Sequence, residues 1–291
     1  MEFIRDLKEI SKKDMAIAGG KGANLGELLK IKIPVPPGFV ILTQAFKEFL
    51  EEAYMDEGAK AMRNKINFKD TKSVEKRSEF IRNLILRAKI REEVRKKILN
   101  SFEKLKSKRV AVRSSATIED SKIDSWAGQL ETYLNITKEN LIENVKKCWA
   151  SLYAPQALSY RTRRNLWNKK IAVAVIVQKM IQPEVSGVCF TAHPVTKDKN
   201  HLIIETIQGL GELLVQGKAT PNSYTVAKDK LKISEVNIVV KERRDLSEKQ
   251  IRELTKLCLK VEGHYKVPQD IEWAIEKDKF YILQTRPITT I

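Results

Sequence analysis

The chain contains little cysteine, and its cysteines are scattered. Cys148, Cys189 and Cys258 are the only three among 291 residues. An odd number of widely separated thiols argues against a disulfide framework, and the short paired spacings of a structural zinc site are missing. We therefore expect three reduced thiols in a cytoplasmic protein.

Long hydrophobic runs and a recognisable leader are also missing. The longest clean apolar run covers only residues 171–177, whereas a helix needs about 20 apolar residues to span a bilayer. The N-terminal segment MEFIRDLKEISKKD is charged throughout, unlike a secretory signal peptide. The sequence predicts a soluble protein without a membrane partner.

The sequence has no internal repeat, low-complexity tract or linker rich in proline or serine. Any division of the chain must therefore fall in an ordinary loop. The break at Gln182 and Pro183, between two β-rich segments, is the candidate boundary and predicts subdomains at 1–182 and 183–291. Helical and strand-like segments are mixed, with antiparallel neighbours, which indicates an α+β or mixed α/β fold.

Acidic residues are outnumbered, with 54 Lys and Arg against 37 Asp and Glu, which gives a formal charge of +17. Such a charge could attract nucleic acid. Most of the basic residues are interspersed with acids, however, and known nucleic-acid signatures are absent. A surface rich in Lys, Glu and Ile accounts for the same numbers, so a nucleic-acid partner is the lesser expectation.

The C-terminal segment DIEWAIEKDKFYILQTRP reads as a β-hairpin with one polar face. Because strand side chains alternate, Ile271, Trp273 and Ile275 should share one face of the first strand. Asp270 and Glu272 should share the other face.

A three-residue loop at 277–279 would place Glu272 opposite Gln284 and Asp270 opposite Arg286. The same loop would place Trp273 opposite Leu283 and Ile275 opposite Tyr281.

Two carboxylates, an amide and a guanidinium on one strand face suit a divalent cation with a polyphosphate. A solvated sheet face with one surface ion pair explains the four residues equally well.

Two basic residues lie beside small residues near the ends of predicted elements. Lys21 stands among Gly19, Gly20 and Gly22 just before a helix, where backbone N–H groups favour an anion. The Walker spacing is missing, and a turn with an exposed lysine is the commoner explanation. Arg113 ends an apolar strand, as either a phosphate clamp or a buried structural ion pair.

Two further segments could contact a nucleotide. The loop SWAGQLET at 125–132 offers Ser125, Gly128, Gln129 and Thr132, and it could close over phosphates, although a plain turn is the default interpretation. Gln178 and Met180 follow a buried strand, where exposed backbone could bind an adenine edge. A simple strand end is the default there.

The motifs together are more specific than each alone. In order they are GGKGANLGEL, VRSSA, SWAGQLET, VQKM, SGVCFT, IIETIQGLGELLVQG, DIEW and LQTRP. From about residue 10 to residue 290 the chain resembles the N-terminal nucleotide-binding domain of the phosphoenolpyruvate synthase and pyruvate phosphate dikinase family.

The resemblance implies an ATP-grasp-like fold, in which two α+β subdomains clasp ATP and Mg²⁺ and a β-hairpin closes the chain. It implies that Lys21 and Arg113 hold the phosphates under the loop at 125–132, and that Gln178 and Met180 meet the adenine. It also implies that Glu272 and Gln284 ligate or orient the metal, that Asp270 supports nucleotide or metal, and that Arg286 stabilises the transferring phosphoryl group.

The family's reaction moves the β-phosphoryl group of ATP to a histidine on a separate carrier domain, and from there to pyruvate. The γ-phosphate goes to water or to phosphate. The chain contains neither the glycine-rich histidine motif nor a pyruvate-binding barrel, so we expect these domains on another polypeptide or in a longer enzyme. The loop also has Lys122 and Ile123 where the family often places a proline, which leaves its geometry open.

Two alternatives to a dikinase module follow from the same residues. One is a non-catalytic ATP sensor, because the binding residues are present and the acceptor is not. The other is a module that phosphorylates a small molecule, as in antibiotic phosphotransferases.

Overall fold

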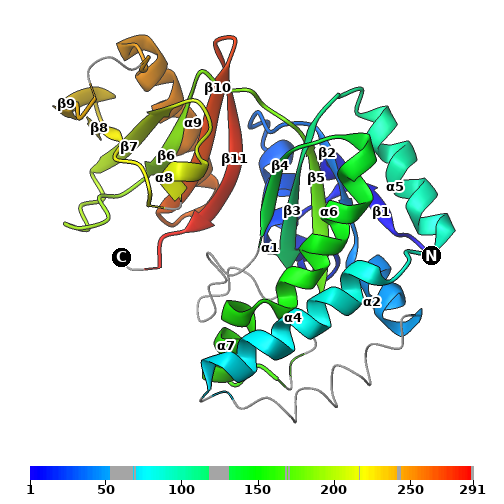
Figure 1. Ribbon diagram of the computed structural model, residues 1–291. Helices are drawn as coiled ribbons and strands as arrows, with labels where there is room; N and C mark the ends of the chain where they lie inside the picture. Colours follow the sequence, from blue (N-terminus) through cyan, green and yellow to red (C-terminus); the bar gives the residue numbers. More distant parts are fainter. Residues whose placement is uncertain are drawn as a thin grey trace. The chain divides into compact units, whose positions relative to one another are not determined.

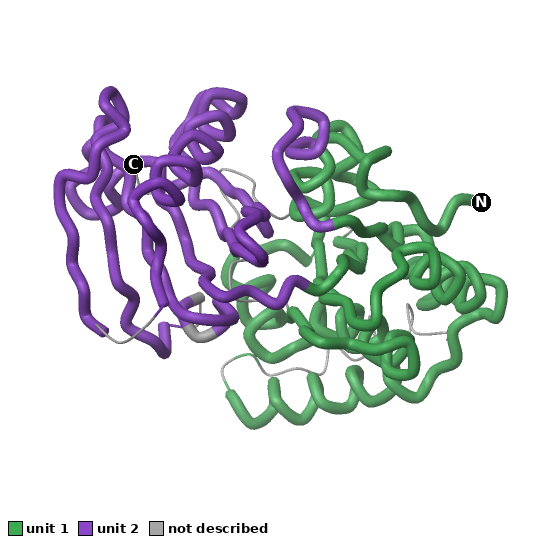
Figure 2. Tube along the Cα trace, turned by 90° about the horizontal axis from the view of Figure 1, so that it is seen from above, with its two compact units in different colours: residues 1–26, 37–180 green, residues 27–36, 181–291 purple. Residues whose placement is uncertain are grey.

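The structure is a computed structural model that describes residues 1–52, 68, 70–117, 131–167, 169, 171–215, 217–240 and 244–289. It divides into two compact units, drawn in green and purple in Figure 2. The first comprises residues 1–26 and 37–180, and the second comprises residues 27–36 and 181–291. The long C-terminal portion of the second unit thus begins two residues before the expected boundary, and a short segment from the N-terminal half joins it.

The first unit is built on a five-stranded antiparallel sheet with strand order β1-β2-β5-β3-β4. Its strands are β1 (Ile4–Asp6), β2 (Gly38–Ile41), β3 (Val110–Ala116), β4 (Thr132–Ile136) and β5 (Val173–Lys179). Its helices are α2 (Thr43–Glu52), α4 (Thr71–Arg87), α5 (Glu92–Lys104), α6 (Lys138–Ala150) and α7 (Pro155–Arg163), with short 3-10 turns at Leu7–Glu9, Lys12–Asp14 and Ser151–Tyr153. Helix α1 (Met15–Lys30) begins in this unit and ends in the segment assigned to the second.

The core of the first unit lies between the sheet and helix α6, which runs along β3 and β5 (Figure 1). Trp149 is fully buried there, with ring centroids 5.8 Å from Phe46 and 4.9 Å from Phe49. Strands β3 and β5 are buried along nearly their whole length; helix α6 packs against both, and each pairs with a strand on either edge. Side chains on β3 are therefore held in fixed positions.

The second unit is built on a six-stranded antiparallel sheet with strand order β11-β10-β6-β7-β8-β9. Its strands are β6 (Val185–Phe190), β7 (His201–Gln208), β8 (Asn222–Ala227), β9 (Lys232–Asn237), β10 (Gln269–Glu276) and β11 (Lys279–Pro287), and its helices are α8 (Glu212–Val215) and α9 (Glu248–Tyr265). Helix α9 packs against β10 (Figure 1), and its buried face is apolar apart from Thr255. The predicted α+β class is confirmed.

None of the described helices is both long and apolar enough to cross a membrane.

Candidate functional site

The hairpin of β10 and β11 turns in two residues and not in the three that the sequence suggested. Glu276 pairs with Lys279, and Lys277 and Asp278 between them have φ angles of 51° and 58°. Two successive left-handed residues form the tight turn whose twist matches that of antiparallel strands.

The shorter turn changes the apolar pairs. Trp273 lies opposite Ile282 and Ile275 lies opposite Phe280, so the predicted partners Leu283 and Tyr281 were wrong. The predicted apolar face is confirmed, because Ile271, Trp273 and Ile275 are all nearly fully buried.

The polar pairs of the hairpin are those that the sequence predicted. A β-bulge between Glu272 and Trp273 leaves one extra residue on β11 and shifts the register by one. The extra residue in the bulge compensates for the one residue that the shorter turn lacks, so the pairing beyond the bulge is the predicted one. Glu272 therefore pairs with Gln284, and Asp270 pairs with Arg286.

Arg286 and Asp270 form a close ion pair on this face. Nε and Nη2 of the guanidinium donate to Oδ2 of the carboxylate at 2.8 and 2.6 Å. The Arg286 side chain keeps 35% of its surface exposed against 14% for Asp270. Burial raises the pKa of Asp270, the Arg286 charge lowers it, and the nearby Glu272 carboxylate raises it again. The two carboxylates therefore repel each other across a partly buried face.

Glu205 joins this face from β7, and the sequence analysis missed it. Glu205 pairs with Val188 of β6, which in turn pairs with Glu272 of β10. Residues directly opposite one another across a sheet point to the same side, so Glu205 lies in the same row as Glu272. Burial and the charge of Asp270 raise the pKa of Glu205. Its signal was a lone carboxylate directly after the apolar run LII in HLIIETIQ.

The glycine turn of the first unit lies against β3. Gly19 interrupts α1 with φ 71° and ψ 174°, angles that are essentially restricted to glycine. The Gly22 N–H donates to Ser115 Oγ at 3.1 Å. Lys21 thus lies at the start of the helical segment that follows the turn, one residue before a backbone amide bound to β3.

Arg113 and Thr132 are brought together in the same sheet. Arg113 is buried on β3, and Thr132 of β4 is its direct partner across the strands. Ser114, between Arg113 and Ser115, binds the backbone carbonyl of Glu131 through both its N–H and its hydroxyl, at 3.1 and 2.7 Å. These bonds tie the residue before Thr132 to β3. Ser125, Gly128 and Gln129 lie outside the described residues.

Gln178 and Met180 are both buried at the end of β5. Gln178 lies opposite Ala111 of β3 and therefore points to the same side of the sheet as Arg113. The N–H of Met180 donates to the carbonyl of Arg109 at 3.1 Å, and the N–H of Lys179 donates to that of Pro37 at 2.8 Å. An adenine edge at this strand end would therefore contact carbonyl oxygens or side chains.

The polar face of the hairpin is not a complete metal site by itself. Within the described ranges, no three His, Cys, Asp or Glu side chains are grouped closely enough to hold a metal ion. A cation bound by Asp270 and Glu272 would need further oxygens, for which the Gln284 amide and a phosphate are suitable.

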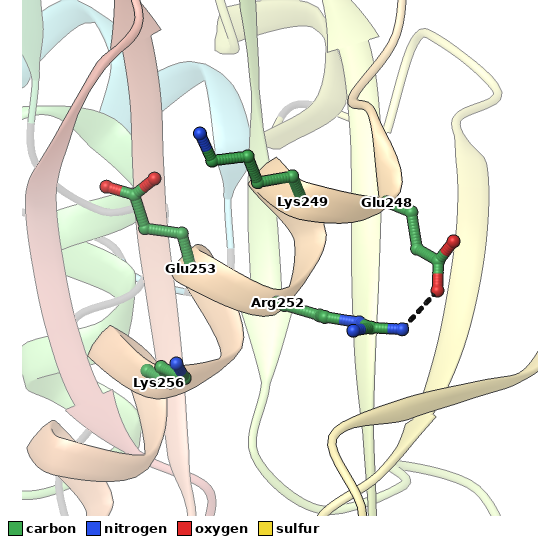
Figure 3. Close-up of a pocket in the computed structure, with 5 residues that line it drawn as sticks. All are labelled: Glu248, Lys249, Arg252, Glu253 and Lys256. Carbon is green, nitrogen blue, oxygen red and sulfur yellow. Dashed lines mark hydrogen bonds and ion pairs between the residues drawn. The ribbon is translucent and has the colours of Figure 1, made fainter.

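A separate hollow lies along the exposed side of α9 (Figure 3). It is lined by Glu248, Lys249, Arg252, Glu253 and Lys256. Arg252 donates to Glu248 at 2.5 Å, one helical turn away. Exposed pairs at this spacing stabilise a helix slightly and need no ligand, so the hollow is a solvated helix face.

The family model of the pyruvate phosphate dikinase AMP/ATP-binding domain matches residues 15–244 and 234–291 of the chain. The chain belongs to this family. The match includes Lys21, Arg113 and the entire closing hairpin.

Curated relatives carry the name phosphoenolpyruvate synthase. A probable phosphoenolpyruvate synthase of Methanocaldococcus jannaschii is 40% identical over 100% of this chain and 27% of the relative. One from Archaeoglobus fulgidus is 42% identical over 98% of this chain and 41% of the relative. The phosphoenolpyruvate synthase of Pyrococcus furiosus is 36% identical over 99% of this chain and 44% of the relative. The chain thus spans less than half the length of these relatives.

Among solved structures, D-alanyl-alanine synthetase A from Vibrio cholerae is 11% identical, over 93% of this chain and 56% of that one, with a TM-score of 0.43. A likeness at this level assigns no fold.

Proposed function

We propose that the chain is the ATP- and Mg²⁺-binding module of a phosphoenolpyruvate synthase-like dikinase. The observation that carries the proposal is the polar face of the hairpin, defined by Asp270, Glu272, Gln284 and Arg286, in a chain of an AMP/ATP-binding family. Burial of a carboxylate to the extent seen for Asp270 costs free energy, and an ordinary solvated strand face does not require it.

The first unit supplies the remaining contacts to ATP under this proposal. Lys21 and Arg113 neutralise the phosphates, and Thr132 contributes a hydroxyl beside Arg113. Gln178 and Met180 contact the adenine. Ser125, Gly128 and Gln129 are assigned to the loop over the phosphates through the family resemblance alone.

The second unit supplies the metal site and the catalytic arginine. Asp270, Glu272 and Gln284 fit a hard divalent cation, since their carboxylate and amide oxygens are the ligands that Mg²⁺ takes from proteins and the repulsion between the carboxylates favours a cation. When bound, Mg²⁺ would neutralise charge on the phosphate oxygens. Asp270 holds the Arg286 guanidinium in a fixed orientation, from which it can stabilise the transferring phosphoryl group.

The proposed reaction breaks the bond between the α- and β-phosphoryl groups, with AMP as the leaving group. The β-phosphoryl group bonds to a histidine nitrogen on a carrier domain, and the γ-phosphoryl group passes to water or phosphate. The protein contributes positioning and charge neutralisation to such a transfer. The greater length of the relatives agrees with further domains, which we propose bind pyruvate and carry the histidine.

Calorimetric titration with a non-hydrolysable ATP analogue tests this function. The wild-type chain should bind in the micromolar range with Mg²⁺ and more weakly without it, and Glu272→Ala should remove the metal dependence. Glu235→Ala is the matched control, since Glu235 is an exposed glutamate on β9 of the same sheet and its loss should leave binding unchanged. Absence of wild-type binding would contradict the proposal.

Addition of a histidine-bearing carrier domain tests the transfer step. The proposal predicts AMP formation and a phosphohistidine on the added domain. Binding of the analogue without either product would instead identify a non-catalytic ATP binder.

A further inference from the structure

Helix α1 lacks a side-chain cap of its own where it restarts after the glycine turn. Gly19 has non-helical angles, and the helical segment continues from Gly20 to Lys30. Gly19 is therefore in the N-cap position, where a Ser, Thr, Asp or Asn oxygen normally accepts a hydrogen bond from the second or third helical N–H group. Glycine has no side chain with which to do so.

Ser115 provides this missing oxygen from β3. Its hydroxyl accepts from the N–H of Gly22, the third residue of the helical segment, at 3.1 Å. A Cβ atom built on Gly19 would lie 2.3 Å from Ser115 Oγ. The Ser115 hydroxyl thus occupies the space in which the side chain of an N-cap residue would stand, and it makes the hydrogen bond of that side chain.

The cap connects Lys21 and Arg113, the two cationic residues that are proposed to hold the phosphates. Ser115 and Arg113 are two residues apart on β3 and point to the same side of the sheet. Lys21 is the second residue of the capped helical segment, between Gly20 and Gly22. One fully buried strand therefore carries Arg113 and also holds the first turn that carries Lys21.

We propose that Ser115 is a positioning residue that caps the α1 segment from β3 and so fixes Lys21 relative to Arg113. The role of these two cations in holding phosphates rests on the proposed function, whereas the cap itself does not. Loss of the hydroxyl should loosen the first helical turn and let the Lys21 backbone move away from the position set by the strand.

Amide hydrogen exchange of the free protein tests the cap. Ser115→Ala should speed exchange at Gly22 by about fivefold, the loss expected for an N-cap hydrogen bond. Ser78→Ala is the control, because Ser78 is equally buried on α4 of the same unit and its hydroxyl donates to the Tyr153 carbonyl at 2.7 Å. This control should lower thermal stability without changing exchange at Gly22. Unchanged exchange at Gly22 in Ser115→Ala would overturn the proposal.

Binding separates positioning from a merely structural effect. Ser115→Ala should weaken binding of the ATP analogue by up to about fivefold, since affinity can fall no further than the fraction of the chain in which the turn is ordered, and leave adenosine binding unchanged. In a Lys21→Met background the further loss caused by Ser115→Ala should shrink to nearly nothing, because the two residues act through one contact. Unchanged analogue affinity in Ser115→Ala, or an equal loss in both backgrounds, would overturn the positioning role.

Failure of the proposed function gives a different result. If the wild-type chain binds no ATP analogue, the proposed function is contradicted, and exchange at Gly22 alone decides whether Ser115 caps the segment.

Discussion

The two units position their polar residues by different kinds of contact, local in the second unit and long-range in the first. In the second unit, Asp270 and Glu272 reach their face by simple strand alternation, with their partners on the next strand of the chain. In the first unit, the position of Lys21 depends on a glycine turn held by a serine 93 residues away.

The hairpin and the glycine turn differ in how well each tolerates a local change in the backbone. The hairpin kept its polar pairs although its turn is one residue shorter than expected, since a bulge restored the register. The glycine turn has no such freedom, because an added Cβ at Gly19 would lie 2.3 Å from both the backbone oxygen and the hydroxyl of Ser115.

The largest expected effect is that of Gly19→Ala. The substitution combines an angle that alanine avoids with a clash against buried backbone, so we expect a loss of about 3 kcal/mol or more in the free energy of unfolding. Gly209→Ala is the matched control, because Gly209 also has a positive φ, 77°, but nothing lies within 4 Å of an added Cβ.

Urea unfolding measures both variants. The free energy of unfolding of the control should fall by only about 1 kcal/mol, the cost of alanine in a left-handed backbone conformation. Equal losses in the two variants would mean that the contact with Ser115 contributes nothing.

The second effect concerns the hairpin. Arg286→Ala should leave the fold intact, since the side chain is one-third exposed, and should lower AMP formation with an added carrier domain by about 10²-fold, as loss of one preorganised charge does. Arg252→Ala, which removes an exposed arginine of α9, should have no such effect. Global unfolding of Arg286→Ala by circular dichroism would contradict this placement.

Sequence reasoning succeeded where a local rule determined the answer. Period-two alternation gave the buried faces of Trp273 and Ile275, and it put Asp270 and Glu272 on the opposite face. The antiparallel α+β class followed from the order of helical and strand segments.

Sequence reasoning failed where the structure depended on tertiary contacts. The two-residue turn at Lys277 and Asp278 needs two left-handed residues, and Lys277 is not of a type that favours this conformation. Glu205 reaches the row of Glu272 only because β6 pairs with both β7 and β10. The role of Ser115 depends on the approach of β3 to Gly19, which no nearby residue indicates.

The third effect tests what holds α9 to the sheet of the second unit. Lys228 donates to both carboxylate oxygens of Glu262 at 2.8 and 2.7 Å, and Thr191 donates to the same carboxylate at 2.9 Å. Lys228→Met should lower the free energy of unfolding by about 2 kcal/mol, because it leaves a partly buried carboxylate without its cation. Hydrogen exchange should quicken in α9 and stay unchanged in α6, and an equal change in both helices would contradict a stabilising role confined to the second unit.

The smallest effect is a pH-dependent one at Glu205. Its pKa is raised above the ordinary value of 4.5 by burial and by Asp270, so between 4.5 and this raised pKa the folded chain binds more protons than the unfolded chain and loses stability as the pH rises. Glu205→Gln removes this loss. In buffer free of divalent cations the variant should melt about 2 °C above wild type at pH 7, and the difference should vanish below about pH 4, where both side chains are neutral. The control Glu235→Gln, on the exposed strand β9, should melt with wild type at both pH values. If the difference in melting temperature between Glu205→Gln and wild type persists in acid, packing rather than charge is responsible. Repulsion between Glu205 and Asp270 would then not lower the stability of the folded chain.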